Sequence, residues 1–191
     1  MKRIAFSVGL IVLAFAISIW AQTAASKPYP ELNKFDVFVG HWTYEVDYLA
    51  GLLGPSSKIT GEQTIKRILG GFFFENQWTE KEAAEESQGI EIIGLDRVNE
   101  NFFSKEYHDD GSMSSGAYEF DGNTCIYTGK FVVEGKLYMF KITDIFAKDL
   151  MSFTSKGKIS ADGNPWVPWI EGKYTKAGLT PKKPPMAGGT R

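Results

Sequence analysis

The stretch FVGHWTYEVDY (residues 38–48) decides the fold. From its Trp onward, every second residue is apolar or aromatic and the residues between them are polar. Side chains of a β-strand alternate between the two faces of a sheet, so this period of two predicts a strand with one buried face. The residues of that face are Trp42, Tyr44, Val46 and Tyr48.

The same alternation returns along the rest of the chain. Asp-Gly, Glu-Gly and Gly-Asn pairs separate the alternating segments, and glycine there supplies the positive φ that hairpin turns require. The spacing predicts about ten strands joined mostly by hairpins, and the absence of an interrupting helical pattern excludes parallel βαβ units. The clearest further segments are 72–80 (FFFENQWTE), 125–134 (CIYTGKFVVE), 137–147 (LYMFKITDIFA), 150–160 (LMSFTSKGKIS) and 165–175 (PWVPWIEGKYT).

One short helix is expected before the first strand. In PELNKFDVFVG (30–40), Pro30 suits a first helical turn and Gly40 suits a C-terminal stop. The apolar residues between them recur at helical spacing, which indicates a helix with one buried stripe.

The fold class predicted is all-β: a single antiparallel, up-and-down barrel of about ten strands with a short N-terminal helix, over residues 26–178. Closure removes both sheet edges and buries the aromatic face at once. A two-sheet sandwich is the alternative, because it also produces short strands at regular spacing. A membrane-embedded outer-membrane barrel fits less well, because polar and charged groups occur on both faces of 58–69.

The two ends of the chain are expected to lie outside the barrel. Lys2 and Arg3, an apolar run and then AQTAAS (21–26) form the three parts of a secretory signal, so residues 1–25 are predicted to be a signal peptide and the protein to be secreted or periplasmic. An uncleaved membrane anchor is the alternative, although the run is shorter than the roughly 20 residues of a spanning helix. Residues 179–191 are predicted to be a flexible, Pro- and Gly-rich tail.

The charge and cysteine content of the chain limit the kinds of partner and of stabilisation that we expect. Cleavage would leave 19 basic against 23 acidic residues, a net charge of −4, with no basic face for nucleic acid or an anionic membrane. The single cysteine, Cys125, forms no intrachain disulfide, so the core alone must stabilise the domain. The predictions are therefore no nucleic-acid partner and no stable membrane insertion, with any protein partner left open.

Three motifs in order resemble a known family. GHW (40–42) resembles the G-x-W that opens lipocalin-like barrels. RILGGFFFENQW (67–78) resembles the Arg-x-Leu-Gly-Gly-aromatic segment of one bacterial family of such barrels, and residues 89–116 resemble the central Gly-x-Asp strand and hairpin of the same family. The resemblance is to a secreted or periplasmic bacterial lipocalin-like family of unknown function and implies a calycin-type barrel of about ten strands. The chain lacks a histidine after His108, so the late histidine that ligates iron in related haem-binding barrels is missing, and no cofactor is expected.

Signatures of catalysis and metal binding are sparse. The sequence has no G-x-S-x-G, no H-E-x-x-H, no phosphate-binding glycine loop and no CxxC pair. His108, Asp109 and Asp110 could hold a metal together, but HDDGS (108–112) also has the composition of a hairpin turn, the reading we favour. No catalytic or metal-ligating residue is therefore assigned; an acid–base pair assembled from distant strands stays open.

Aromatic residues carry the binding hypothesis. A barrel of more than eight strands must enclose a cavity or flatten, and Tyr and Trp give an apolar wall with polar tips. Arg67 could meet a carboxylate of a ligand or form a surface ion pair. The leucines of 49–57 (LAGLLGPSS) could cover the mouth or pack outside. The candidate ligand-binding residues are Trp42, Tyr44, Tyr48, Arg67, Phe74, Trp78, Tyr127, Phe131, Phe140 and Phe153.

Three hypotheses follow from the sequence. The first is an exported protein that binds a small apolar or amphipathic molecule inside the barrel. The second is an enzyme that uses the same cavity with His108 or a buried carboxylate as general base, and the third is a protein-interaction module. A carrier predicts a cavity with few titratable groups, an enzyme predicts converging acids or histidine with displaced pKa values, and an interaction module predicts a filled barrel with an exposed apolar patch.

Overall fold

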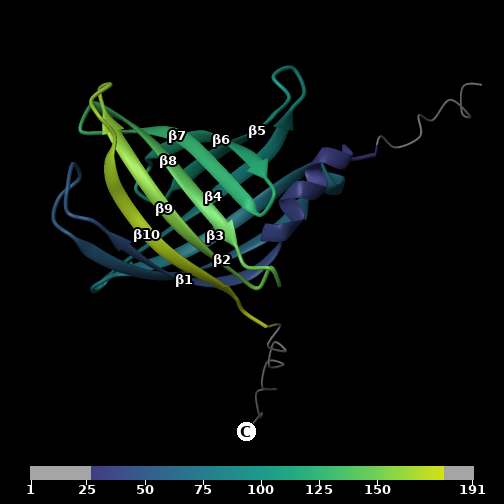
Figure 1. The fold of residues 1–191 in the computed structure, drawn as a ribbon, viewed down its shortest axis with the longest axis horizontal. Coiled ribbons are helices and arrows are strands. Elements are labelled where there is room, and N and C mark those ends of the chain that lie inside the picture. Colours follow the sequence, from purple (N-terminus) through teal and green to yellow (C-terminus); the bar gives the residue numbers. More distant parts are fainter. Residues whose placement is uncertain (1–26, 179–191) are drawn as a thin grey trace, which may run out of the picture.

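A computed structural model describes residues 27–178 as a closed antiparallel barrel of ten strands in up-and-down order (Figure 1). The predicted signal peptide and C-terminal tail lie outside the described residues. The strands are β1 (Gly40–Tyr48), β2 (Ser57–Ile68), β3 (Phe73–Glu82), β4 (Glu85–Asp96), β5 (Asn101–His108), β6 (Met113–Asp121), β7 (Thr124–Val133), β8 (Lys136–Phe146), β9 (Ser152–Ala161) and β10 (Val167–Lys176). Antiparallel pairing of β1 with β10 closes the barrel, which confirms the predicted fold class.

The N-terminal helix is a 3-10 helix, η1 (Pro30–Phe38), with Pro30 at its start as expected. Its three buried residues are Leu32, Phe35 and Phe38. A spacing of three residues matches the three residues per turn of a 3-10 helix, so this geometry places all three side chains on one face. The helix ends one residue earlier than Gly40 suggests, because Val39 is already extended and Gly40 opens β1 at a φ of 138°.

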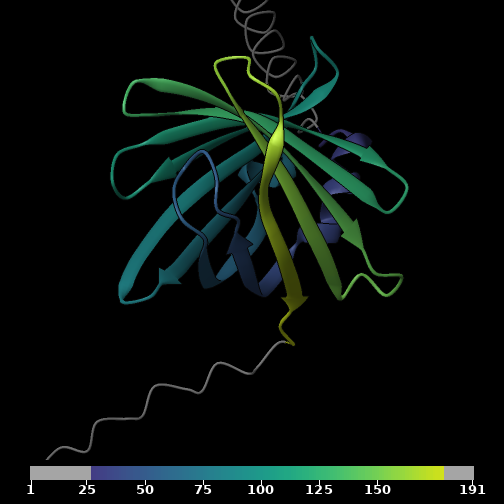
Figure 2. The ribbon, with the colours of Figure 1, turned by 60° about the vertical axis from the view of Figure 1, so that its left-hand side comes forward.

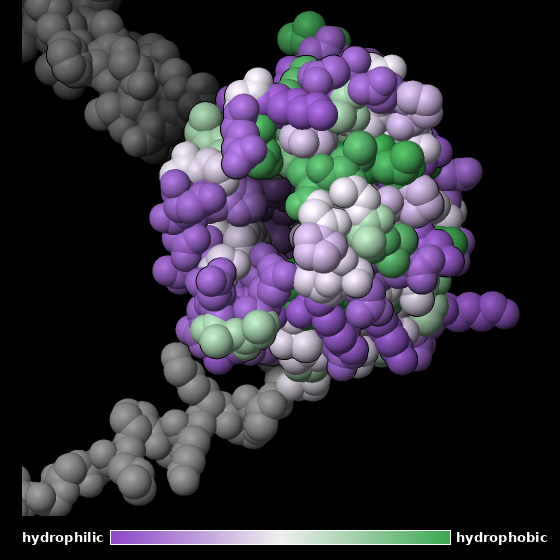
Figure 3. Space-filling view, turned by 90° about the vertical axis from the view of Figure 1, so that its left-hand side faces the viewer, coloured by the Kyte–Doolittle hydropathy of each residue, from purple (hydrophilic) through white to green (hydrophobic). Residues whose placement is uncertain are grey.

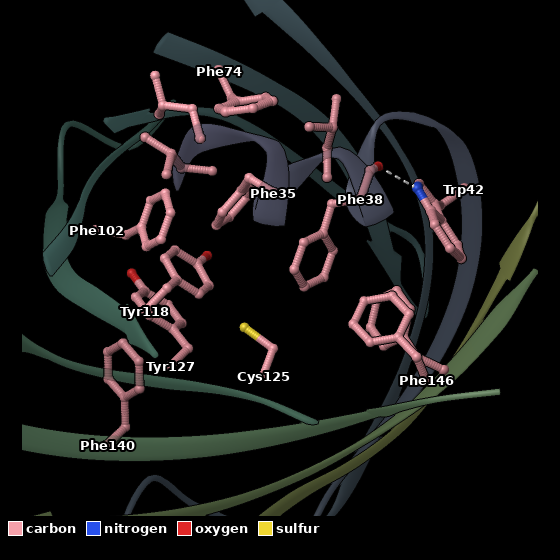
Figure 4. Packing of buried hydrophobic residues seen from close by; sticks show 14 residues of the cluster. Phe35, Phe38, Trp42, Phe74, Phe102, Tyr118, Cys125, Tyr127, Phe140 and Phe146 are labelled. Carbon is pink, nitrogen blue, oxygen red and sulfur yellow. Dashed lines mark hydrogen bonds between the residues drawn. The ribbon is translucent and has the colours of Figure 1, made fainter. Parts of the chain in front are cut away.

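Helix η1 closes one end of the barrel, which we call the floor. Phe35 and Phe38 project from the helix into a ring of aromatic side chains supplied by several strands (Figure 4). Phe35 lies 5.1 Å from the ring of Phe74, and Phe38 lies 4.9 Å from that of Phe146 (ring centroids). A second short 3-10 helix, η2 (Leu69–Gly71), joins β2 to β3 at this end.

Trp42 fixes η1 to the first strand. Its side chain is fully buried, and its indole Nε1 donates a hydrogen bond of 2.7 Å to the backbone oxygen of Phe38 (Figure 4). The ammonium of Lys176, on the last strand, lies 5.0 Å from the centre of the indole ring. The Trp of the G-x-W motif therefore joins the helix, the first strand and the last strand at the floor.

We expect Trp42→Phe to lower the free energy of unfolding by about 2 kcal/mol, because the buried carbonyl oxygen of Phe38 would lose its donor. Chemical denaturation followed by fluorescence measures the change. Trp166→Phe is the matched control, since Trp166 lies in the exposed β9–β10 loop and is 43% exposed. Equal losses in the two variants would contradict a structural role for the hydrogen bond.

The opposite end of the barrel is open, and we call it the mouth. It is formed by the connections β1–β2, β3–β4, β5–β6, β7–β8 and β9–β10, which lie together at the end away from η1 (Figures 1 and 2). Among residues 27–178, no helix has the length and apolar character needed to cross a bilayer.

Candidate functional site

A cavity of about 620 Å³ lies inside the barrel between the floor and the mouth. Phe35 and Phe38 of η1 line its lower end, and residues of three mouth loops, Leu53, Asp110 and Glu134, line its entrance. Viewed toward the mouth, the surface is hollowed, with hydrophilic residues along one side of the opening and hydrophobic residues along the other (Figure 3). The interior is therefore accessible and is not filled by its own side chains.

Seven of the ten residues predicted to bind a ligand line this cavity. The other three, Trp42, Arg67 and Phe74, are in the floor. Whether an inward-facing residue lines the cavity or belongs to the floor depends on its height along the strand. Alternation predicts the face of the sheet but not this height. The seven are Tyr44, Tyr48, Trp78, Tyr127, Phe131, Phe140 and Phe153.

Arg67 is committed to a contact within the protein. Its guanidinium forms a two-point ion pair with Asp36 of η1, with Nε–Oδ1 at 2.8 Å and Nη2–Oδ2 at 2.9 Å. It also donates to the side-chain oxygen of Asn33 and to the backbone oxygen of Gly71, and it stacks over the ring of Phe74. Arg67 therefore holds η1 on the barrel and lies outside the cavity lining.

One wall of the cavity is apolar and aromatic. Trp169 of β10 packs on Phe131 of β7 and Phe140 of β8, at ring-centroid distances of 5.9 and 5.8 Å, and Phe131 and Phe140 are 5.9 Å apart. Tyr48 contacts Trp169 at 5.7 Å. Ile142 lines the same region. This wall offers a surface against which an aliphatic chain or a flat ring can be buried.

The opposite wall carries a line of polar side chains, which we call the acid row: Asn76, Glu91, Glu106 and Ser114. Each is the direct cross-strand partner of the next, so the row crosses β3, β4, β5 and β6 at one level. All four line the cavity. The two glutamates therefore face the interior side by side, although like charges placed directly opposite destabilise a sheet.

Hydrogen bonds hold the acid row in place. Glu91 accepts the phenol proton of Tyr118 at 2.6 Å and the side-chain amide of Asn76 at 3.3 Å. Glu106 accepts from the hydroxyls of Ser114 and, at 3.4 Å, of Tyr127. Tyr118 and Tyr127 stack on each other at 4.2 Å between ring centroids. The carboxylates therefore have fixed positions.

The protonation equilibria of Glu91 and of the neighbouring His108 are displaced. Removal from water, and then the charge of Glu106, raise the pKa of Glu91 far above its ordinary value. The pKa of His108 is raised by its interaction with Glu106, whose Oε2 lies 3.8 Å from the imidazole Nε2. Glu91 and His108, on the neighbouring strands β4 and β5, therefore both have pKa values above the ordinary values of their side-chain types.

Two further acids face the interior away from the row. Burial raises the pKa of Asp144, which accepts a hydrogen bond from Ser155, to about 7. Burial also raises the pKa of Glu80, near the mouth, although hydrogen bonds from Ser87 and Tyr44 oppose the change. The cavity therefore collects acidic groups at several heights.

Two buried polar atoms have no hydrogen-bond partner among the described residues. They are the side-chain oxygen of Asn76, in the acid row, and the indole Nε1 of Trp169, on the apolar wall. Buried polar atoms of folded proteins are nearly always paired, so each such atom calls for an explanation. Both residues line the cavity, where a bound molecule could pair with them.

The sequence analysis did not assign the acid row. The signal was present, because alternation in GIEIIG (89–94) places Glu91 on the face of Ile93, and alternation in FFSKEYH (102–108) places Glu106 on the face of Ser104. The register of β4 on β5 brings the two acids together, because it pairs Glu91 with Glu106, which is 15 positions further along the chain. Carboxylates in alternating strands normally face solvent, so the pattern alone favours the outward reading.

His108 ends β5, and the residues after it form a turn. Asp109 accepts a hydrogen bond from the backbone of Gln88, and Asp110 accepts one from the backbone of Ser112. No group of three or more His, Cys, Asp or Glu within residues 27–178 is placed to hold a metal ion. Cys125 is buried in the floor, and burial raises the pKa of its thiol, so it is not a reactive thiolate.

The loop between β1 and β2 lies at the mouth. Leu53 lines the cavity entrance, and Leu49 and Leu52 are 37% and 42% exposed. A bridge between Gly51 and Gly54 shapes the loop. The loop therefore contributes one leucine to the entrance, and all three leucines are in contact with solvent.

The fold and the cavity define a lipocalin-like β-barrel with an accessible interior. The chain belongs to the family described as "Protein of unknown function (DUF1579)", whose model matches residues 27–176. The expectation of a family of unknown function with a closed barrel of about ten strands is confirmed, and the secreted or periplasmic location of its members stays a prediction. A search of curated proteins found no match.

Solved structures with the same fold are distant in sequence. Rv2717c from M. tuberculosis superposes with a TM-score of 0.57 at 12% identity, over 80% of this chain and 100% of that one. The S-type phycobiliprotein lyase CPES from Guillardia theta superposes with a TM-score of 0.52 at 11% identity, over 76% and 92%. At such identities the likeness establishes the fold.

Proposed function

We propose that this protein binds a small amphipathic molecule in the interior of its barrel. The observation that carries the proposal is the cavity of about 620 Å³ with one aromatic wall and one polar wall. Cavities of this size hold drug-sized ligands, and a few fixed polar groups on an otherwise apolar surface give such sites their orientation. The unpartnered buried atoms of Asn76 and Trp169, two residues of the cavity lining, support the proposal, because rotation of these side chains toward the cavity would let a ligand supply the missing partners.

The similar solved structures agree with this reading. One of them is named a phycobiliprotein lyase. A closed barrel of this kind is therefore compatible with handling small molecules, although the sequence identity of 11% transfers no substrate.

The test is a fluorescence titration with Nile red, a neutral probe whose emission rises in apolar surroundings. We expect saturable binding to the wild type and at least about a tenfold loss of affinity in Ile142→Trp, which would fill the aromatic end of the cavity. Met139→Trp is the matched control, because Met139 lies on the same strand, faces outward and is 46% exposed. Equal affinities in both variants, with thermal unfolding unchanged, would place the probe outside the barrel and contradict the proposal.

We also propose that the protein is exported, on the basis of the signal-like pattern of residues 1–25. Intact-mass analysis of the protein from its own host, after separation of secreted, periplasmic and cytoplasmic fractions, tests this. A chain shortened by 21 or 25 residues outside the cytoplasm supports export. A full-length chain in the cytoplasm contradicts it.

An enzyme is the second candidate, and it is favoured by the pairing of His108 with Glu106 beside Glu91 in the cavity. A carboxyl group that stays protonated near neutral pH can act as a general acid. Native mass spectrometry of protein from its own host identifies a co-purifying molecule. A molecule that the wild type alters with time, and that Glu106→Gln leaves intact, would favour the enzyme. The open cavity argues against an interaction module with a filled barrel.

A further inference from the structure

We propose that the acid row binds a cationic nitrogen, so that the ligand is an amphipathic amine or ammonium compound rather than a fatty acid, a phosphate ester or a neutral lipid. The inference rests on the proposed function, because it names the head group of the molecule held in the same cavity. Four independent features of the interior support it.

The first feature is the pairing of Glu91 with Glu106. They are direct cross-strand partners on β4 and β5, and both point into the cavity. Side chains in that relation have Cβ atoms about 5 Å apart, a distance at which one cation can contact both carboxylates. A cation bound there would contact both groups and offset the repulsion that arises once Glu91, like Glu106, is ionised.

The second feature is the unpartnered oxygen of Asn76. This residue lines the cavity and is 7% exposed; its amide nitrogen already donates to Glu91, and its oxygen is a buried acceptor without a donor among the described residues. The row therefore offers acceptor atoms from Glu91, Glu106 and Asn76 together. An ammonium group brings up to three N–H donors and no acceptor, whereas a carboxylate or phosphate brings acceptors only.

The third feature is the sign of charge throughout the cavity. Among the described residues, none of the lysines or arginines lines it, and His108 is its one basic side chain. A concave site lined with one sign of charge and walls of low dielectric concentrates ions of the opposite sign. The acids that line it are Glu80, Glu91, Glu106, Asp110, Glu134 and Asp144.

The fourth feature is the aromatic surface next to the row. The rings of Tyr118 and Tyr127 stack beside Glu91, and Trp78 lies one position along the strand face from Asn76, with its ring 5.2 Å from that of His108. Aromatic faces attract cations as well as apolar groups. The apolar part of the ligand would extend toward Phe131, Phe140 and Trp169 on the opposite wall.

Binding of a cation in this place is coupled to loss of a proton. Glu91 holds its proton in the empty cavity; on binding, the carboxyl O–H bond breaks, the proton leaves to solvent, and the carboxylate pairs with the ammonium. Affinity therefore rises with pH as long as the amine stays protonated. The ionisable groups that interact with Glu91 from the surrounding strands are Glu106, Tyr118, Cys125 and Tyr127, and His108 acts on the pair through Glu106.

Three probes with one tail test the head group: decylamine, decanol and decanoate, titrated calorimetrically at pH 7.5 below their aggregation limits. We expect decylamine to bind at least about tenfold more tightly than decanol, and decanoate to bind most weakly. Glu91→Gln and Glu106→Gln should each weaken decylamine by about tenfold and leave decanol unchanged. Glu119→Gln, an exposed acid on β6, should change neither.

Calorimetric titration in two buffers of different ionisation enthalpy measures the number of protons released when a probe binds. Decylamine should release protons from the wild type at pH 7.5, and the release should vanish in Glu91→Gln. If decanol or decanoate binds as well as decylamine, the cationic head group is wrong while the ligand-binding function stands. If Nile red and all three probes fail to bind, the proposed function itself is overturned.

Discussion

At pH 9 the Glu91→Gln variant is expected to unfold at a temperature higher than the wild type by about 5 °C or more, and at pH 5 the difference should disappear. The reason is the burial of Glu91, which is 3% exposed and has no cationic partner among the described residues. A glutamine in its place can accept the Tyr118 proton and donate to the free oxygen of Asn76.

The sign follows from where the proton is held. The pKa of Glu91 is raised in the folded protein above the ordinary value of 4.5, so between those two pKa values the folded state keeps a proton that the unfolded state releases. Stability therefore falls as pH rises through that window, by about 1.4 kcal/mol per pH unit for one group, and levels off above the raised pKa. Below pH 4.5 both states are protonated and the contribution vanishes.

Thermal unfolding of wild type and variant from pH 5 to pH 9 measures the effect. Asp144→Asn should act in the same direction over a lower range, since its pKa rises to about 7. Glu119→Gln is the control and should give a curve parallel to the wild type. Parallel curves for Glu91→Gln as well would show that Glu91 ionises freely in the folded protein.

The second large effect is expected at Gly129, on β7. Gly129→Ala should lower the free energy of unfolding by about 3 kcal/mol, a typical cost of overpacking a core. An added Cβ would overlap the ring of Phe140 and would lie 2.7 Å from the backbone oxygen of Ser115. Ser115 is held in the strand ladder, and the ring of Phe140 is restrained by its packing on Tyr127, Phe131 and Trp169.

Chemical denaturation measures this loss. Gly51→Ala is the matched control, because an added Cβ there meets nothing closer than 3.9 Å and no positive φ is involved. A Gly129→Ala variant as stable as the wild type would mean that the ring of Phe140 has room to shift, and the cavity would then be softer than its geometry indicates.

The period-two pattern was sufficient to predict the strands, because each has one buried face, as residues 42–48 show. The same is true of η1, whose three buried residues repeat every third position. These are local properties, and a single sequence contains them. Alternation fits a sandwich as well, and the pairing of β1 with β10 decides for the barrel.

The site was only partly predictable, because it depends on which strands meet and at what height. Arg67 and Asp36 lie 31 positions apart, and only the placement of η1 across the floor joins them. The facing of Glu91 and Glu106 likewise depends on register. Composition favours aromatic walls and solvent-exposed acids, so the pattern identified the apolar side of the cavity and missed the acidic side.

Both ends of the described chain leave the barrel at its floor. Residues 27–30 lead into η1, and β10 ends at Lys176 beside Trp42, while the mouth lies at the other end (Figures 1 and 2). A tag, a fusion partner or a solid support joined at either end is therefore attached on the side away from ligand entry. Protein immobilised in this way should present its mouth to the surroundings and exchange ligand at the rate seen in free solution.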